Sequence, residues 1–301
     1  MRRPLFAIPL SVIPSLAILL LAACSSSDEP SPVPTAKASA AATATTTVPA
    51  NSSTASSGAN ASATSAGAVS AESDDGVLEF SYKHPAEVGA IPELAALLRD
   101  EADSARADAR KTALAERGSA KTDGYEFHTH SLGIEWQVVT QTPRFLSLSN
   151  SFYSFTGGAH GNYGFKGLVW DRRAGKRMAA SELFVSKAAL KAAVLKPFCA
   201  GLDAERRKKG MATPEVDAVF PRCVDPVSEA TVVLGSTNRR AFNRIGFLMD
   251  PYVAGSYAEG SYEVTLPVTP AILAAVKPEL RDAFALRKAR NPPPAALYRL
   301  R

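Results

Sequence analysis

The chain has 301 residues, and 34 lysines and arginines against 29 aspartates and glutamates give it a formal net charge of +5. Without Arg2 and Arg3, which belong to the targeting segment described next, the 34 basic residues become 32 against 29, a net charge of +3. A charge this small and this mixed argues against nucleic-acid binding. About 225 residues follow a low-complexity stretch that ends near residue 76, enough for one substantial hydrophobic core or two small ones.

Residues 1–23 are predicted to be a lipoprotein signal peptide. Two arginines precede an almost continuous apolar stretch at 5–21, and Leu21-Ala22-Ala23-Cys24 follows. This ending resembles a bacterial lipobox, in which the cysteine is acylated and the chain is cut before it. Prolines and small residues favour a cleaved signal over the alternative, a retained membrane helix. We therefore expect lipid on Cys24 to hold the protein at a membrane. The serine after Cys24 favours the periplasmic face of the outer membrane.

Residues 24–76 are predicted to be the lipidated cysteine and a disordered linker. Apart from Cys24, they are dominated by Ser, Ala, Thr, Pro, Asn and Gly. Such a composition cannot bury enough apolar surface to fold. About 50 residues of this kind have a random-coil reach of roughly 40 Å.

Residues 77–150 are predicted to form an N-terminal α/β part. Leu78 to Tyr82 alternates as a strand does, and a helix is expected from Pro92 to about Arg117, before Gly118. Apolar and polar residues alternate again at 125–129 and 132–138, which predicts a strand pair or one long bent strand.

The stretch at the start of residues 151–301 is the most distinctive in the chain. An aromatic run at 152–155 leads into Thr156-Gly157-Gly158-Ala159-His160-Gly161-Asn162, and residues 163–171 are extended again. Three glycines in seven residues allow backbone conformations with positive φ. The pattern predicts a strand, a tight glycine-rich turn and a second strand, followed by another turn at 172–175.

The remaining elements complete an α+β prediction. Ser186 is expected to cap a helix at 187–209 that bends at Pro197 and ends before Gly210. The cations at 206–209 would offset the helix dipole, with a binding patch as the alternative. Strands are expected at 231–234, 243–249 and 261–268, and an interrupted helical segment at 270–286. The predicted fold class is α+β, with mainly antiparallel sheets and packed helices.

Two separated motifs resemble one known domain family. The first runs from Tyr153 through Gly161 and continues to Glu182-Leu183-Phe184; the second joins Asp250-Pro251-Tyr252-Val253-Ala254 to Gly260 and the strand ending at Pro267. Together they are similar to the extracytoplasmic domain of unknown function found in the anti-sigma factor RsiV and the peptidoglycan deacetylase PdaC. The resemblance covers about residues 150–267. It implies an RsiV/PdaC-type fold in which residues 151–301 form the C-terminal RsiV-like domain and residues 77–150 its companion.

Cys199 and Cys223 are predicted to form a disulfide. Two cysteines in one exported domain usually pair in an oxidising compartment. The alternatives are two free thiols or a metal site shared with histidine.

The histidines offer one metal hypothesis. His128 and His130 stand two apart on an expected strand, so both would point to one face. With His160 they would supply three nitrogen ligands for zinc. We favour the simpler interpretation, in which His128 and His130 are exposed polar residues, and predict no metal and no cofactor. For His160 two roles remain open: fixing the turn or contacting a ligand.

No catalytic residue is predicted. The sequence lacks Gly-x-Ser-x-Gly, Ser-x-x-Lys, His-Glu-x-x-His and a phosphate-binding loop. In PdaC the deacetylase is a separate domain, and we expect this protein not to contain it. We likewise expect no cytoplasmic segment and no membrane helix of the anti-sigma type.

The prediction is therefore a non-catalytic, lipid-anchored binding module. The resemblance to RsiV, which binds lysozyme, implies a protein such as lysozyme or a peptidoglycan fragment as partner. A structural envelope lipoprotein and a metal-dependent hydrolase are the alternatives. The expected binding residues surround the glycine-rich turn, where glycines expose backbone amides and tyrosines offer contact area: Tyr153, Thr156, Gly157, Gly158, His160, Asn162, Tyr163 and Tyr252.

Overall fold

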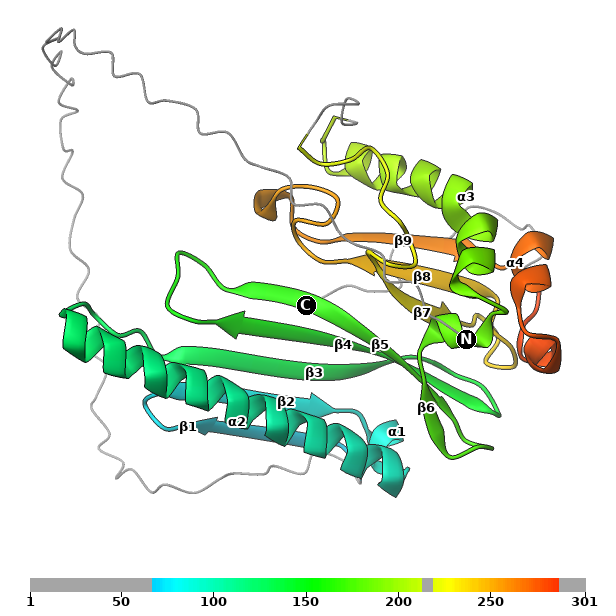
Figure 1. The fold of residues 1–301 in the computed structure, drawn as a ribbon. Helices are drawn as coiled ribbons and strands as arrows, with labels where there is room; N and C mark the ends of the chain where they lie inside the picture. The colour runs from blue at the N-terminus through cyan, green and yellow to red at the C-terminus, as the bar shows by residue number, and fades with distance from the viewer. Residues whose placement is uncertain (1–66, 213–218, 287–301) are drawn as a thin grey trace, which may run out of the picture. The chain divides into compact units, whose positions relative to one another are not determined.

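The computed structural model describes residues 67–212 and 219–286. The expected signal peptide, Cys24 and most of the expected linker lie outside these residues. The described part is an α+β fold with two sheets, as predicted (Figure 1). None of its helices combines the length and the apolar character needed to span a membrane.

The larger sheet has six strands in the order β1-β2-β3-β4-β5-β6. Only β2 and β3 are parallel, and the helices α1 (Ala86–Gly89) and α2 (Pro92–Asp123) connect them. All other neighbours pair antiparallel. The strands are β1 Val69–Asp74, β2 Leu78–His84, β3 His130–Gln141, β4 Phe145–Phe155, β5 Asn162–Asp171 and β6 Lys176–Met178.

Helix α2 lies against β2 and β3 and covers one face of this sheet (Figure 1). Pro92 at its first turn and Gly124 in the left-handed conformation, with φ +77°, define its ends. The expected end before Gly118 is wrong, because the helix continues through this surface glycine, where a missing side chain costs only about 1 kcal/mol. The core beneath the helix combines Leu94, Leu98, Phe80, Tyr82, Trp136, Leu146, Leu148, Leu168 and Trp170.

Strand β1 corrects the expected linker. The predicted disordered stretch ended at residue 76, whereas every residue from 69 to 74 pairs antiparallel with β2. An edge strand needs backbone partners more than bulky side chains, and only Val69 of β1 packs against a core. The sequence pattern of β1 was therefore too weak to identify it.

Two other expectations also change. Residues 125–129 are not a strand, since β3 begins at His130. The expected boundary between residues 150 and 151 falls inside β4, whose pairing with β5 runs without interruption from Phe145 to Ser154. The two predicted parts therefore share one continuous strand.

The second sheet has three antiparallel strands, β7 Thr231–Gly235, β8 Arg244–Met249 and β9 Tyr262–Pro267. Helix α3 (Lys187–Lys208) packs against β9, and Ser186 caps it as predicted by accepting a hydrogen bond from the Ala189 amide at 3.0 Å. Helix α4 (Pro270–Ala275) and the 3-10 turns η1 (Ala180–Leu183), η2 (Tyr257–Glu259) and η3 (Pro278–Ala283) complete the unit.

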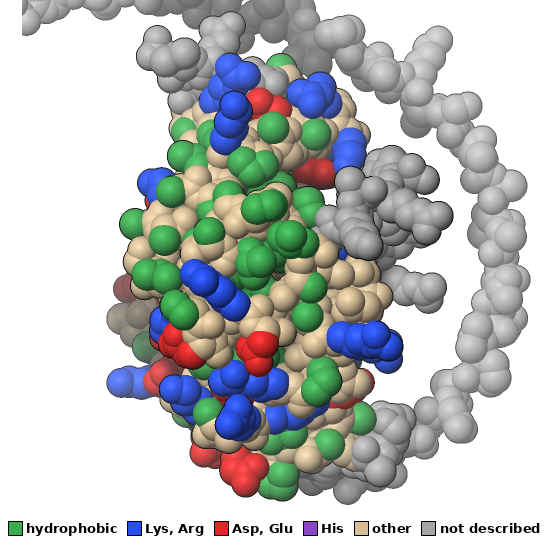
Figure 2. All heavy atoms as spheres, turned by 90° about the vertical axis from the view of Figure 1, so that its right-hand side faces the viewer, with side chains coloured by type: hydrophobic (Ala, Val, Ile, Leu, Met, Phe, Trp, Pro, Cys, Tyr) green, Lys and Arg blue, Asp and Glu red, His purple; other side chains and the backbone are tan. Residues whose placement is uncertain are grey.

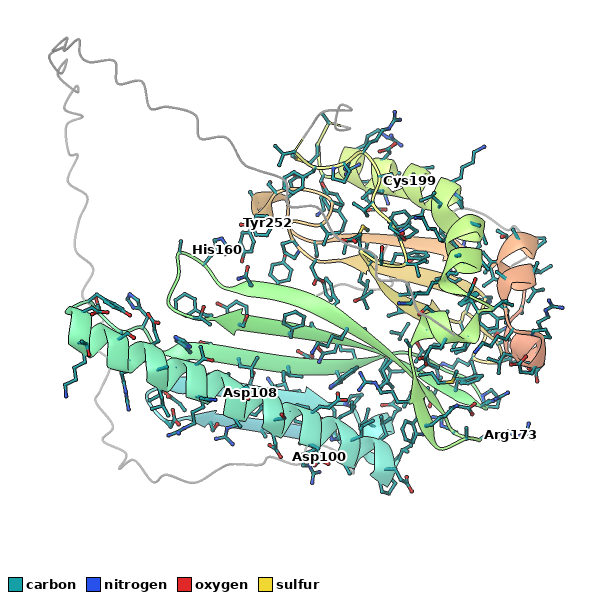
Figure 3. The ribbon with its side chains drawn as sticks, viewed as in Figure 1. Asp100, Asp108, His160, Arg173, Cys199 and Tyr252 are labelled. Carbon is teal, nitrogen blue, oxygen red and sulfur yellow. A yellow bond between two sulfur atoms is a disulfide. The ribbon has the colours of Figure 1, made fainter. Side chains whose placement is uncertain are left out.

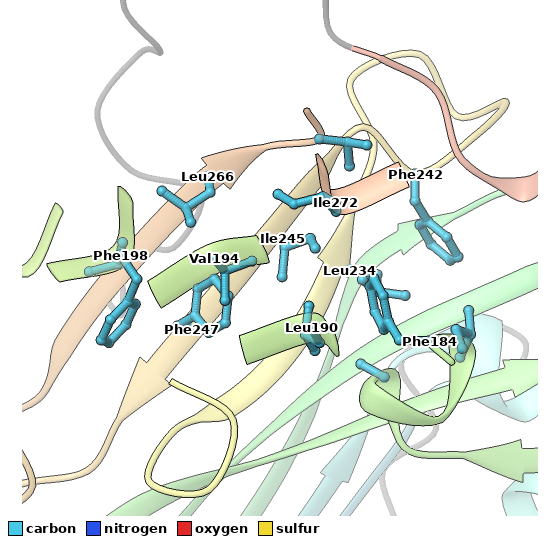
Figure 4. Close-up of a cluster of buried hydrophobic side chains, with 14 of the residues drawn as sticks. Phe184, Leu190, Val194, Phe198, Leu234, Phe242, Ile245, Phe247, Leu266 and Ile272 are labelled. Carbon is cyan, nitrogen blue, oxygen red and sulfur yellow. The ribbon is translucent and has the colours of Figure 1, made fainter. Parts of the chain in front are cut away.

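A second core fills the space between this sheet and its helices. Figure 4 shows side chains of α3, β7, β8, β9 and α4 meeting there. Phe145 of β4 and Val169 of β5 belong to the same cluster. The central members are Phe184, Leu190, Val194, Phe198, Leu234, Phe242, Ile245, Phe247, Leu266 and Ile272.

The predicted disulfide is confirmed. Cys199 of α3 and Cys223 are bonded, with their Cα atoms 5.4 Å apart. The bond ties the middle of α3 to the segment that precedes β7. In the chain-entropy account, a closed loop of this length contributes about 3.5 kcal/mol to stability.

Polar contacts fasten β5 and β4 to the second sheet. The Phe165 amide of β5 donates to Asp250 Oδ1 at 2.9 Å, and its carbonyl accepts from Thr231 Oγ1 at 2.9 Å. The Leu234 amide of β7 donates to Ser147 Oγ of β4 at 3.3 Å. These bonds use backbone groups that an edge strand would otherwise leave free.

Glu263 of β9 is predicted to make stability depend on pH. Burial raises the pKa of Glu263 to about 7, and the charge of Glu205 adds to the rise. The Thr265 hydroxyl opposes the rise by donating a hydrogen bond to Glu263 Oε1 at 3.4 Å. The folded state therefore keeps a proton between about pH 4.5 and 7 that the unfolded state releases, so the free energy of unfolding falls as pH rises through this window.

We expect Glu263→Gln to raise the free energy of unfolding by roughly 1–3 kcal/mol near pH 8, because the amide resembles the protonated acid. Near pH 4 the variant and the wild type should be equal. Urea unfolding at several pH values checks this, and parallel pH profiles of the two proteins would contradict it.

Candidate ligand-binding surface

The turn between β4 and β5 is open to solvent. Thr156, Gly158, His160 and Asn162 are exposed, as a contact surface requires. Gly157 has φ +84°, in the region that favours glycine. Of the three glycines in this turn, Gly158 and Gly161 are not in that region.

Gly161 is required for a different reason. A Cβ atom added there would lie 2.3 Å from the hydroxyl oxygen of Tyr153, so only glycine lets this ring cover the turn. Tyr153 and Tyr163 are direct partners across β4 and β5, which places their side chains next to each other on one face. Tyr153 is 44% exposed, whereas Tyr163 is partly buried and its hydroxyl accepts from the Ser261 amide at 3.1 Å.

His160 meets two tyrosines from the segment between β8 and β9. Its ring stacks on Tyr257, with centroids 3.9 Å apart and planes at 21°. Its Nε2 lies 3.4 Å from the Tyr252 hydroxyl, and Figure 3 shows the two side chains facing each other. The Gly161 carbonyl has two hydrogen-bond partners here. His160 Nδ1 lies 3.0 Å from it, and the Tyr257 hydroxyl donates to it at 2.6 Å. His160 therefore fixes the turn and is exposed at the same time.

These rings form one continuous patch, which we call the aromatic surface: Tyr153, His160, Tyr163, Tyr252 and Tyr257. Tyr252 is its most exposed tyrosine, at 52%. Its φ is +69°, an uncommon conformation for a bulky residue that costs of order 1 kcal/mol or more. Strained residues of this kind are enriched at functional sites.

Two cations at the end of α3 hold the segment that carries Tyr252 and Tyr257. Arg206 is fully buried, and its guanidinium donates to the carbonyls of Ala254 at 2.8 Å, Pro221 at 3.0 Å and Arg222. Lys209 Nζ donates to the carbonyls of Glu259 at 2.7 Å and Ser261 at 2.5 Å. The expectation that these cations only offset the helix dipole is therefore wrong for Arg206 and incomplete for Lys209.

Glu259 completes this support. Its carboxylate accepts from the Ser256 amide at 2.8 Å and from the Tyr262 hydroxyl at 2.5 Å. Burial opposes its ionisation, but these hydrogen bonds and the nearby Arg206 charge outweigh burial and hold the pKa of Glu259 below its usual value. The carboxylate therefore stays charged and keeps η2 in place at neutral pH.

The electrostatics of the aromatic surface favour neutral hydrogen bonding over acid–base chemistry. Desolvation, and then the neighbouring Tyr163, Tyr153 and Tyr252, raise the pKa of Tyr257, so its hydroxyl stays protonated. Burial raises the pKa of Asp250, which precedes Tyr252 by two residues, although the hydrogen bond from the Phe165 amide opposes the rise. Asp250 is occupied with the edge of β5, which is a structural role.

The histidine metal hypothesis does not fit the structure. His130 is buried at the start of β3 and stacks on Phe127, while His128 lies before the strand and is exposed. Both earlier expectations, a shared strand face and two exposed side chains, are wrong for this pair. Within residues 67–212 and 219–286, no group of three His, Cys, Asp or Glu side chains could hold a metal ion.

The structure thus brings together most of the residues predicted from sequence. Tyr153, His160, Tyr163 and Tyr252 share one surface, with Thr156, Gly157, Gly158 and Asn162 in the adjoining turn. The sequence analysis missed Tyr257, Arg206 and Lys209. Tyr257 lies inside the second motif and could have been included, but nothing local distinguishes Arg206 from its neighbours.

Comparison with known proteins finds one family similar to this region. Residues 71–163 match the family model described as Deacetylase PdaC. The predicted resemblance is thereby confirmed, although the matched range covers β1 to the start of β5 and overlaps only the beginning of the predicted range 150–267. No curated protein matches the chain.

Two solved structures are similar to the chain. One is a DUF3298 family protein from Pseudomonas aeruginosa PAO1, 20% identical, with 73% of this chain and 96% of that chain covered and a TM-score of 0.40. The other is a member of the DUF3298 family from Bacteroides fragilis NCTC 9343, 17% identical, with 63% and 80% covered and a TM-score of 0.35. Neither likeness bears on function.

We expect Arg206→Met to lower the free energy of unfolding by roughly 3–5 kcal/mol, because it removes a buried guanidinium that donates to three carbonyls, that of buried Ala254 among them. Arg207→Met is the matched control, since Arg207 is the next residue of α3 and is exposed; its effect should stay within about 0.5 kcal/mol. Urea unfolding measures both. Hydrogen exchange of residues 250–261 should accelerate only in Arg206→Met, and equal exchange in the two variants would contradict the assigned role.

Proposed function

We propose that this protein is a non-catalytic, lipid-anchored binding module of the bacterial envelope, and that its aromatic surface recognises a cell-wall-related ligand. The observation that carries the proposal is the mutual ring contact of His160, Tyr252 and Tyr257, with exposed Tyr153 on the same surface, beside an open glycine-rich turn. Rigid aromatic side chains give large contact area at low entropic cost and dominate the energetics of many interfaces.

The chemistry of the surface supports a neutral, polar ligand such as a peptidoglycan fragment. The aromatic surface contains no carboxylate, and its rings offer flat apolar faces against which the C–H groups of a sugar can pack. Hydroxyls of the tyrosines and the exposed side chain of Asn162 can bond sugar hydroxyl or acetamide groups. A few polar groups among aromatic rings is the usual composition of a small-ligand site.

A protein such as lysozyme is the second candidate, supported by the family resemblance. A basic protein would favour acidic contacts. The exposed charged side chains on the same elements include two lysines: Lys166 of β5, which lies over Phe152, and Lys209 at the end of α3, which lies over Tyr262. Charge therefore favours the glycan over a basic protein. The binding experiment below includes both.

We expect Tyr252→Ala to weaken binding of soluble muropeptides about 30-fold, corresponding to about 2 kcal/mol for a central aromatic contact. Tyr125→Ala is the matched control, because Tyr125 is 46% exposed but lies just beyond the end of α2. Calorimetric titration with muropeptides, and separately with lysozyme, measures both variants.

The outcomes separate the candidates. If Tyr252→Ala loses muropeptide binding and Tyr125→Ala does not, the glycan site is supported. If Tyr252→Ala loses lysozyme binding but not muropeptide binding, the protein site is supported. Equal effects of Tyr252→Ala and Tyr125→Ala would refute the aromatic surface. A wild-type protein that binds neither probe would refute both candidates and favour a structural lipoprotein.

Membrane attachment is predicted to depend on Cys24. Replacing Cys24 with alanine should move the protein from the membrane to the soluble envelope fraction, because two or more acyl chains anchor stably. Mass spectrometry of the wild-type N-terminal peptide should find the lipid adduct. An unmodified Cys24, together with unchanged fractionation of the variant, would disprove the anchor.

A further inference from the structure

The turn between β5 and β6 gathers basic side chains at the end of β5 remote from the aromatic surface. Arg172, Arg173, Lys176 and Arg177 are all exposed, and Figure 3 shows Arg173 at the tip of this hairpin. Figure 2 is viewed from the side of the molecule on which Figure 1 draws β6 and α4. Lys and Arg side chains gather in the lower half of this view. We call Arg172, Arg173, Lys176 and Arg177 the basic turn.

Asp171 holds the basic turn in one conformation. Its buried carboxylate accepts from the Arg173 amide at 2.9 Å and the Ala174 amide at 3.2 Å, and pairs with Arg144 at 2.8 Å. Although burial opposes ionisation, Arg144 and the turn amides keep the pKa of Asp171 below its usual value. Gly175, with φ +59°, completes the turn. The cations are therefore presented by a preformed hairpin, which reduces the entropy lost on binding.

The local charges do not cancel. Asp171 balances Arg144, and Glu101 of α2 pairs with Arg177. Arg172 donates to the Thr142 carbonyl at 2.8 Å and to Gln141 Oε1 at 3.2 Å, both of which are neutral.

Arg173 and Lys176 form no ion pair with the described residues. Asp282 also acts on this region, through its charge on Arg144. The three cations without a counter-ion, Arg172, Arg173 and Lys176, project from one rigid turn.

We propose that the basic turn docks on the phosphate headgroups of an anionic phospholipid bilayer. Guanidinium and ammonium groups bind phosphate oxygens by charge-assisted hydrogen bonds, and guanidinium does so as a rigid fork. A bilayer also accommodates apolar side chains beside such cations.

Figure 2 shows hydrophobic side chains above the basic ones on the same face. Val185, which joins η1 to α3 and bonds Ala275 of α4 through its amide, is 59% exposed. The choice of membrane phosphates rests on the envelope location proposed above, whereas the aromatic surface plays no part in it.

Vesicle partitioning tests the proposal with the full chain carrying Cys24→Ser, which cannot be acylated at that position. The measured quantity is the partition coefficient for phosphatidylcholine vesicles with about a third phosphatidylglycerol, divided by that for pure phosphatidylcholine. This ratio cancels any contribution of the apolar N-terminal segment that is common to both vesicles. Arg173→Gln combined with Lys176→Gln should lower the ratio about 30-fold, which corresponds to about 1 kcal/mol for each cation near an anionic bilayer.

Arg117→Gln combined with Lys121→Gln is the matched control. It removes the same charge from exposed positions near the C-terminal end of α2 and should change the ratio less than about twofold. For the wild type, the ratio should fall as salt rises. Thermal unfolding of all variants should be unchanged, since these side chains are exposed.

Three results would overturn the proposal. Equal losses in the two double variants would show an effect of net charge alone, and a wild-type ratio near one would show no preference for anionic lipid. Binding of soluble polyphosphate without binding of vesicles would assign the basic turn to a soluble anion. None of these results affects the muropeptide titration, so failure here is distinguishable from failure of the proposed function.

Discussion

The pairing of β4 with β5 is the interaction on which the rest of the described structure depends. Side chains of these two strands alternate between two cores: Leu148 and Leu168 point toward α2, whereas Phe145 and Val169 join the core of the second sheet. This pairing also positions the two ends of β5. Its first residue, Asn162, adjoins the aromatic surface, and its last, Asp171, directly precedes the basic turn. At about 3.3 Å per residue, ten residues of strand separate these surfaces by roughly 30 Å.

The aromatic surface is assembled from two parts of the chain, one of which is held by the end of α3. Its turn residues come from the β4–β5 hairpin, and Tyr252 and Tyr257 come from the segment between β8 and β9. Arg206 bonds the Ala254 carbonyl in that segment and the Arg222 carbonyl beside the disulfide-bonded Cys223. One buried guanidinium therefore joins the disulfide-linked segment to the segment that carries the rings.

The two proposals use this arrangement together. Contact of the basic turn with a bilayer would occupy one end of β5 and leave the aromatic surface at the other end free for a ligand. Asp171 and Asp250 serve comparable structural purposes at the two ends, since each carboxylate accepts backbone amides that the ladder does not use. In the two proposals, the aromatic surface would bind through aromatic rings and the basic turn through cations, so salt should weaken the second interaction more strongly.

The sequence by itself determined the fold class, α3 with its cap at Ser186, the pairing of Cys199 with Cys223 and the glycine-rich turn, because each depends on local residue types or on chemistry that few residues share. Only the tertiary structure revealed β1, whose backbone pairing leaves no strong side-chain pattern, and the separation of exposed His128 from buried His130. It also decided the role of Arg206. In the sequence, Arg206 is one of four consecutive cations, and only packing against distant segments buries it and gives its guanidinium three carbonyl partners.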